Sequence, residues 1–319
     1  MRAPGLGWIS YFCVYRMENL LLIFACLSAG LLLQRIREFP SDGYKALNQY
    51  VIHVALPGLA LYYIPKIELG GNILYPLGIA WIGYVLSFGF FLFLGYWFAW
   101  PRKLTGCLIL TAGLGNTSFV GFPIIEALYG SEGLKTAVIV DQAGTFVVMA
   151  TLGTLTASFF SNEKPDVGAM VRKILTFPPF VAFVLGMVMG VLKWQVPAYA
   201  DTFFLRLAQT VAPVALVAVG LQLKLAKRNQ YWRFLSVGLL FKLFLMPLFF
   251  LLFYRYVLAF DGPMSDVCIM EAAMAPMITG AILASSYGLK PRLSGMMVGV
   301  GIPLSLLTLL VWHWALGML

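Results

Sequence analysis

The sequence predicts an all-α polytopic membrane protein with ten transmembrane helices, arranged as two inverted repeats of five. The first observation is composition: the chain is 61% hydrophobic and 11% charged, with a mean hydropathy of +0.88, whereas soluble domains carry about 25% charged residues. The second is a series of apolar runs of bilayer length, and the third is a pair of polar, proline-containing interruptions at matching places in the two halves. A net charge of +9 then indicates basic loops at a membrane, not a nucleic-acid partner.

Ten apolar runs predict the spans in order. Residues 1–17 form an aromatic N-terminal tail, and Arg16 near its end imitates a secretory signal. No small-residue cleavage site follows, so the apolar residues from Glu18 are interpreted as the first helix. Each run approaches the about 20 residues that a helix needs to cross a bilayer, and the long run 73–98 must tilt. The expected spans are 18–34, 46–64, 73–98, 106–128, 136–160, 174–193, 203–223, 232–257, 264–287 and 294–317.

A polar stretch divides the ten spans into two sets of five. We expect a first repeat at 18–160, a cytoplasmic linker at 161–173 and a second repeat at 174–317. Because five is an odd number, the second repeat must be inverted. Weak echoes support repetition: Pro57 and Pro213 are 156 positions apart, and the Tyr-Gly pairs that close the fourth and ninth spans are 158 apart.

The placement of basic residues predicts the orientation. Fourteen of the 22 lysines and arginines fall in the connections on one side, and seven fall on the other side. This is the positive-inside pattern. We therefore expect a multi-pass protein of the cell membrane with both termini extracellular or periplasmic. The four cysteines lie in or beside apolar runs, without the spacing of a metal site or a disulfide framework.

The fourth span cannot be a uniform helix. Its centre combines three glycines with three consecutive polar residues, and a proline follows that cannot donate a backbone hydrogen bond. In lipid, the freed backbone groups must find partners in the protein or line a wet cavity. This predicts a substrate site, with a proline-kinked packing helix as the alternative. The interruption comprises Gly113, Gly115, Asn116, Thr117, Ser118, Gly121 and Pro123.

The ninth span is interrupted in a similar way. Pro276 and Gly280 break it, with Glu271 before the proline and Thr279 after it. Since proline suits the first turn of a helix, Pro123 and Pro276 are each expected to start a new half-helix. The N-termini of such half-helices carry partial positive charge, which favours an anionic substrate.

Ionisable residues within the other spans are interpreted by depth. Asp141 and Gln142 open the fifth span, where a carboxylate is costly unless it has a function. We expect Glu271, with Asp141 and Gln142, to bind a cation or carry a proton; structural hydrogen bonds are the alternative. Asn116 is expected to contact the substrate or the crossing helix, with capping of the broken helix as the alternative. The remaining candidates are interpreted as structural or interfacial: Glu126, Lys242, His53, Asp266 and His313.

The motif NTSFVGFP at 116–123 and the motif EAAMAP at 271–276 resemble the auxin efflux carrier family, which includes bacterial carboxylate carriers and plant PIN-type exporters. The resemblance covers nearly the whole chain from Met17. It implies an NhaA-like or bile-acid-symporter-like fold in which helices 4 and 9 cross. Helices 1, 2, 6 and 7 would form a scaffold, and helices 3, 4, 5, 8, 9 and 10 a transport core. The related sodium/bile-acid symporters carry a glutamine where this chain has Ala275, which argues against coupling to two sodium ions.

Together these features predict a secondary-active or facilitative carrier of a small organic anion, such as a mono- or dicarboxylate, with elevator or rocking alternating access. No lysine or arginine lies in either interrupted stretch, so neutral donors and backbone amides near Gly121 and Met277 are expected to recognise the anion. The expected substrate-binding residues are Asn116, Thr117, Ser118, Gly121, Phe122, Pro123, Pro276, Met277 and Thr279.

Two rival functions stay open: a sodium-coupled symporter of sterol-like or other organic anions, and a membrane sensor with a transporter-like pocket. An enzyme is not expected, because Ser118 is followed by Phe119 and neither histidine is placed as its base. The chain has no nucleotide-binding GxxxxGK[ST] motif. The expected partners are the anion and the lipid bilayer, and a homodimer stays open. No cofactor is expected beyond a coupling proton or a sodium ion, which Glu271 would hold.

Overall fold

A computed structural model describes residues 21–40, 42–67, 73–161, 166–194, 196–223 and 230–318. Regular structure in these ranges is helical, apart from one isolated antiparallel bridge. Within these ranges, five helical segments are long and apolar enough to cross a membrane, or six when one bent pair counts as a span. The expected class, an all-helical membrane-spanning protein, is therefore confirmed. The expected N-terminal tail, 1–17, lies outside the described residues.

The helices follow the expected apolar runs, with π-helical turns inserted into several of them. In the first half they are Leu21–Leu33, α2 (Gly43–Tyr50), η1 (Val51–Ala55), α3 (Leu56–Tyr63), η2 (Ile64–Lys66), α4 (Leu74–Trp97), α5 (Arg102–Ala112), η4 (Thr117–Gly121), α6 (Phe122–Ile139), η5 (Val140–Phe146), η6 (Met149–Gly153) and α7 (Thr154–Ser161). In the second half they are α8 (Val167–Leu175), α9 (Pro178–Val191), α10 (Ala198–Ala208), α11 (Val211–Gln222), α12 (Trp232–Leu240), η7 (Phe241–Leu245), α13 (Met246–Leu252), η8 (Phe253–Val257), α14 (Pro263–Ala272), α15 (Ile278–Ser286) and α16 (Pro291–Met318).

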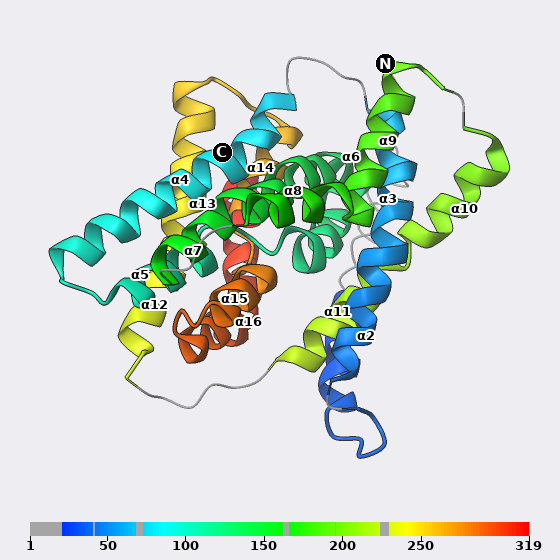
Figure 1. Ribbon diagram of the computed structural model, residues 1–319. Helices are drawn as coiled ribbons and strands as arrows, with labels where there is room; N and C mark the ends of the chain where they lie inside the picture. Colours follow the sequence, from blue (N-terminus) through cyan, green and yellow to red (C-terminus); the bar gives the residue numbers. More distant parts are fainter. Residues whose placement is uncertain are drawn as a thin grey trace.

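One group of helices lies on one side of the molecule in Figure 1. It contains α2, α3, α9, α10 and α11; α3 packs on α9 and α10, and α11 packs on α2. The helix Leu21–Leu33 joins α11 through backbone contact, since a Cβ on Gly220 would lie 2.9 Å from the Cα of Gly30. The Gln34 amide extends this contact by donating to the Gly220 carbonyl at 2.8 Å.

The other group contains α4 to α7 and α12 to α16 (Figure 1). Here α14 packs on α4 and α6, and α15 packs on α5 and α16. The polypeptide turns sharply at Gly130 within α6 and at Gly288 after α15, where φ is +67° and +65°. Glycine suits both turns because other residues rarely adopt positive φ.

The expected polar linker, 161–173, is partly helical. Residues 162–165 lie outside the described part, and α8 begins at Val167. The Asp166 carboxylate caps this helix by accepting from the Ala169 amide at 2.9 Å. A bend of 59° then separates α8 from α9.

Candidate transport site

The two interrupted stretches meet at their breaks. The first runs from the end of α5 to the start of η4, and the second from the end of α14 to the start of α15. The backbone N–H of Asn116 donates to the Ala275 carbonyl at 2.8 Å, and the backbone N–H of Met277 donates to the Leu114 carbonyl at 3.2 Å. These bonds form the bridge between Gly115 and Pro276. Each break therefore supplies hydrogen-bond partners that the other lacks inside a membrane.

Pro123 lies in the first turn of a helix, as expected, but it does not start the second half of the fourth stretch. The second half of the fourth stretch starts at Thr117, because Asn116 is its N-cap and its Oδ1 accepts from the Phe119 amide at 3.3 Å. The π-helical turn η4 continues directly into α6, and Pro123 lies in the first turn of α6. A proline needs no amide partner there, so the turn absorbs the proline without a second break. Pro276 lies in the break itself, two residues before α15.

Asn116 both caps the helix and leaves a donor free. Its side chain is 3% exposed, and its Nδ2 has no hydrogen-bond partner among the described residues. Since a buried amide nitrogen without a partner is costly, a ligand that accepts from it would gain affinity.

Glu271 is the second buried group without a partner. It lies in the last turn of α14, 1% exposed, and neither carboxylate oxygen has a hydrogen bond within the described chain. The carboxylate lies against the backbone of Gly121, where a Cβ would be 2.7 Å from Oε2. Gly121 therefore leaves the space that the Glu271 side chain needs.

Asp141, in contrast, is well satisfied. Thr117 donates to Oδ1 and Gln142 donates to Oδ2, each at 2.5 Å, and the Ser118 hydroxyl lies near enough to help stabilise the charge. Asp141 therefore binds η4 to η5, and it lies close enough to Glu271 for the two charges to interact. The Oε1 of Gln142 has no partner in the described part of the chain.

Lys242 joins this cluster, which sequence reasoning missed. It lies in η7, is 2% exposed and donates from Nζ to the Ala272 carbonyl at 2.8 Å. Its charge interacts with that of Glu271, and a Cβ on Gly115 would be 3.3 Å from its Nζ. The sequence predicts only a structural role for Lys242, by snorkelling or pairing. The structure brings its ammonium group beside Gly115 of the first break, although no lysine or arginine lies within either interrupted stretch itself. A lysine in the middle of an apolar run is the signal that identifies it.

Several other expected site residues have different surroundings. The amides of Met277 and Gly121 are occupied, the first by Leu114 and the second by the Asn116 carbonyl at 3.0 Å, so neither is available as expected. The side chain of Thr279 is exposed. Phe122 is buried beside Gly121, and the partly buried Met277 packs against the core.

A cavity of about 770 Å³ lies beside the second break. It is bordered by α15 and α16 and by Tyr44 of α2 and Gln222 of α11. Its wall includes Ile278, the first residue of α15, and Arg292 near the start of α16. Asn116 and Glu271 do not belong to its lining. The cavity thus reaches the element that follows the break, between the two groups of helices.

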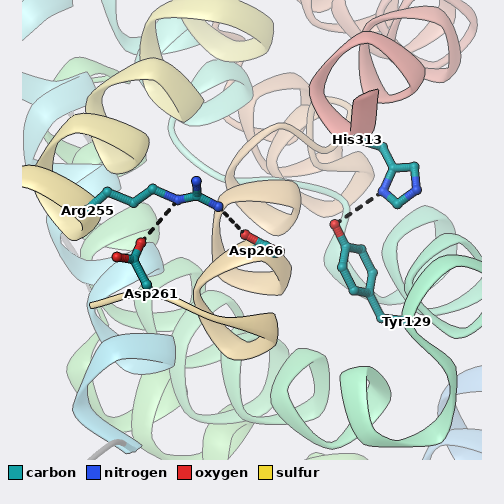
Figure 2. Close-up of polar contacts among 5 residues, drawn as sticks. All are labelled: Tyr129, Arg255, Asp261, Asp266 and His313. Atoms are coloured by element: carbon teal, nitrogen blue, oxygen red, sulfur yellow. Dashed lines mark hydrogen bonds and ion pairs between the residues drawn. The ribbon is translucent and has the colours of Figure 1, made fainter. Parts of the chain in front are cut away.

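Further polar pairs lie away from the breaks (Figure 2). Arg255 forms ion pairs with Asp261 at 3.3 Å and with Asp266 at 2.8 Å, and so fastens the start of α14. Tyr129 and His313 share a hydrogen bond of 3.3 Å between α6 and α16. These contacts agree with the structural interpretation of Asp266 and His313.

Two interrupted helices that pair at their breaks around buried polar groups define a polytopic membrane carrier. A family model described as "Membrane transport protein" matches residues 15–313. The chain belongs to this family, and the expected auxin-efflux-carrier-like relationship is confirmed.

The chain is similar to curated proteins over most of its length. An "Uncharacterized transporter" of Methanothermobacter thermautotrophicus is 28% identical over 305 residues, which cover 92% of this chain and 96% of the relative. An uncharacterized transporter of Methanocaldococcus jannaschii is 24% identical, covering 94% and 98%. A "Putative malonate transporter" of Rhizobium meliloti is 24% identical, covering 83% and 84%. The chain is thus a membrane transporter by family, and these relatives are named as transporters, not as enzymes.

Proposed function

We propose that this transporter carries a small organic anion, a mono- or dicarboxylate, which binds at the paired breaks. The observation that carries the proposal is the combination of two buried groups beside the same bridge: the Asn116 Nδ2, which has no partner among the described residues, and the Lys242 ammonium. A substrate carboxylate would accept a hydrogen bond from Asn116 and share the Lys242 ammonium with Glu271. The name of the Rhizobium meliloti relative supports the same class of substrate. Thr117 and Ser118 would add hydroxyl groups, and Phe122, Pro123 and Pro276 the apolar wall.

The transporter would have ten spans in two inverted repeats, with its fourth and ninth helices crossing at the breaks. The matched positive φ values at Gly130 and Gly288, at the ends of those two stretches, support the repeat. The group around α3 and α11 would be the scaffold, and the group around α5 and α15 would move against it by an elevator or rocking motion. We place the protein in the cell membrane with both termini outside, and keep a homodimer as an option.

The cavity between α15–α16 and α2–α11 would be the route by which the anion reaches the breaks. Arg292 lines it and lies on the side that the basic residues assign to the cytoplasm. A cation at the mouth of a cavity raises the local concentration of an anionic substrate. The route ends at Ile278, beside the break that would hold the substrate.

Coupling would involve Glu271 and a proton, one sodium ion or no ion. The two free oxygens of Glu271 suit either cation. However, Lys242 already provides a positive charge beside it, which weakens the case for two sodium ions. A sodium-coupled symporter of other organic anions is the second candidate. Counterflow of radiolabelled malonate into proteoliposomes, with sodium or a pH gradient varied independently, separates the two: Glu271→Gln should retain counterflow and lose any dependence on the ion gradient.

The direct test is binding of malonate, acetate, a cationic amine and a neutral sugar to purified protein. We expect carboxylates to bind and the amine and sugar not to bind. Asn116→Ser keeps a good helix cap but shortens the donor, and should weaken malonate binding by about tenfold, since hydrogen bonds to charged groups contribute about 1.5–3 kcal/mol. Unchanged affinity would remove Asn116 from the site. Preferential binding of the amine would overturn the anion assignment, and binding without counterflow would favour a sensor.

A further inference from the structure

The helix α8 presents an apolar stripe to the outside of the molecule. Val167, Val171 and Leu175 lie four residues apart, so each is rotated by only about 40° from the last. All three are exposed, by 61%, 49% and 64% of their side-chain surface. They are the longest apolar side chains on that face, and the described residues place nothing over them. An exposed apolar stripe of this kind in a polar connection needs an apolar environment.

The rest of the helix is arranged around this stripe. Met170 is buried and fixes one flank of α8 to the protein, where the helix packs on η6 and α9. Arg172 and Lys173 are exposed, and helical geometry places Lys173 opposite the stripe and Arg172 at its edge. A helix with apolar residues on one face and basic residues on the other matches the surface of a membrane rich in anionic lipids.

The geometry of α8 also suits a position along the bilayer surface. The 59° bend before α9 turns α8 away from the direction of the membrane-crossing helix. Phe177 at the bend stacks on Phe146 with ring centroids 4.0 Å apart. The Asp166 cap holds the other end. The stripe is therefore presented by a helix that is fixed at both ends and already folded.

We propose that α8 is an interfacial anchor. Val167, Val171 and Leu175 enter the boundary of the acyl chains, while Arg172 and Lys173 bind the headgroups of anionic phospholipids. The basic residues favour lipid over a second protein. A bilayer surface offers acyl chains to the stripe and anionic headgroups to both Arg172 and Lys173, whereas a protein partner would need acidic groups both at the edge of the stripe and on the far side of the helix. This inference does not depend on which substrate is transported.

The first test measures depth in vesicles of phosphatidylcholine and phosphatidylglycerol. Cys13, Cys26, Cys107 and Cys268 are replaced, and an environment-sensitive fluorophore is attached through Val171→Cys or, as a matched control, Ala169→Cys on the other face of the same helix. We expect lipids with a quencher near the headgroup end of the acyl chain to quench the Val171 position, and iodide to quench the Ala169 position. Equal quenching by iodide at both positions would overturn the proposal, as would quenching of both only by deep-chain quenchers.

The second test measures lipid selectivity. Native mass spectrometry of the wild type, eluted from equal mixtures of the two lipids, should show bound phosphatidylglycerol in excess. The variant Arg172→Gln/Lys173→Gln should lose at least half of this excess. The control Lys135→Gln, a half-buried lysine paired with the exposed Glu132, should retain it. Equal retention in all three proteins would overturn the proposal, and loss of a dimer peak in the double variant would replace lipid by a second copy.

Discussion

Gly121 and Glu271 are matched in shape, since one lacks a side chain where the other needs room. The glycine belongs to η4 and the carboxylate to α14, yet a single added methyl group would lie 2.7 Å from the carboxylate oxygen. The same region holds Lys242, whose Nζ reaches the Ala272 carbonyl. The properties of the site thus depend on three residues that are far apart in sequence.

At this scale, Gly121→Ala is expected to displace the Glu271 carboxylate and so to reduce transport. Because the carboxylate ends a flexible side chain, the stability cost should lie at the low end of the about 1–3 kcal/mol of overpacking. The double variant Gly121→Ala/Glu271→Ala removes the clash and should recover the thermal stability lost by the single variant. Counterflow and the melting temperature are measured for both, and for Glu271→Ala. If Gly121→Ala melts like the wild type and transports normally, the close contact does not matter.

Lys242→Met keeps the apolar stem and removes the charge. We expect a strong loss of transport and stability. The substitution removes the hydrogen bond to the Ala272 carbonyl, and bonds of charged groups contribute about 1.5–3 kcal/mol; it also leaves the nearby buried Glu271 without an opposite charge. The variant Lys242→Met/Glu271→Gln removes both charges and should be more stable than Lys242→Met alone. A double-mutant cycle of melting temperatures measures this coupling, and purely additive effects would contradict it.

Sequence reasoning found part of this cluster. Asn116, Asp141 and Glu271 could be identified because polar groups inside apolar runs are costly. Lys242 has the same signal, but its partner Ala272 lies 30 positions away and is a backbone carbonyl, which composition does not reveal. Tertiary contacts also decide that Asp141 accepts hydrogen bonds while Glu271 accepts none from the described residues.

The elements are shaped by close backbone contacts and by π-helical turns. The two glycines at the contact between Leu21–Leu33 and α11 let the helices touch directly. The sequence showed that the fourth and ninth stretches must be interrupted, but it placed one restart at Pro123. The helix instead restarts at Thr117 with the π-helical turn η4, so that Pro123 falls within a continuous helical segment. Such turns depend on local packing, which the spacing of apolar residues does not reveal.

For the helix contact, Gly220→Ala is expected to lower the melting temperature of the purified protein. Its Cβ would lie 2.5 Å from the Leu27 carbonyl oxygen, so the helices must separate. Such overpacking lowers the free energy of unfolding by about 1–3 kcal/mol. Gly295→Ala is the matched control, because its Cβ would meet nothing within 4 Å. Equal melting temperatures of the two variants would show that the contact is loose.

The cavity of about 770 Å³ lies between the two groups of helices, on the side of the molecule that carries Arg292. The class of this architecture follows from composition and apolar runs alone. The position of the cavity does not, since it depends on how the two groups of helices pack against each other.

Arg292→Gln is therefore expected to act from one side only. The KM for malonate should rise by about fivefold or more when substrate is offered on the side of Arg292, because electrostatic steering is lost. It should stay unchanged from the other side. Transport is measured in vesicles of defined orientation, with Arg37→Gln, another exposed arginine of the same expected side, as the control. Equal effects from both sides would contradict the cavity as a substrate route.

The backbone hydrogen bonds that join Asn116 to Ala275 and Leu114 to Met277 also constrain the order of folding during synthesis, because each bond needs both halves of the chain. The first break leaves the ribosome about 160 residues before its partner, which at about 5–20 residues per second is an interval of roughly 10 to 30 s. During that interval its backbone groups lack their final partners, and lipid supplies none. The first break therefore has to stay in contact with water or with other protein until the second half has been synthesised. Expression of the two halves as separate chains should yield stable protein only when both are made together.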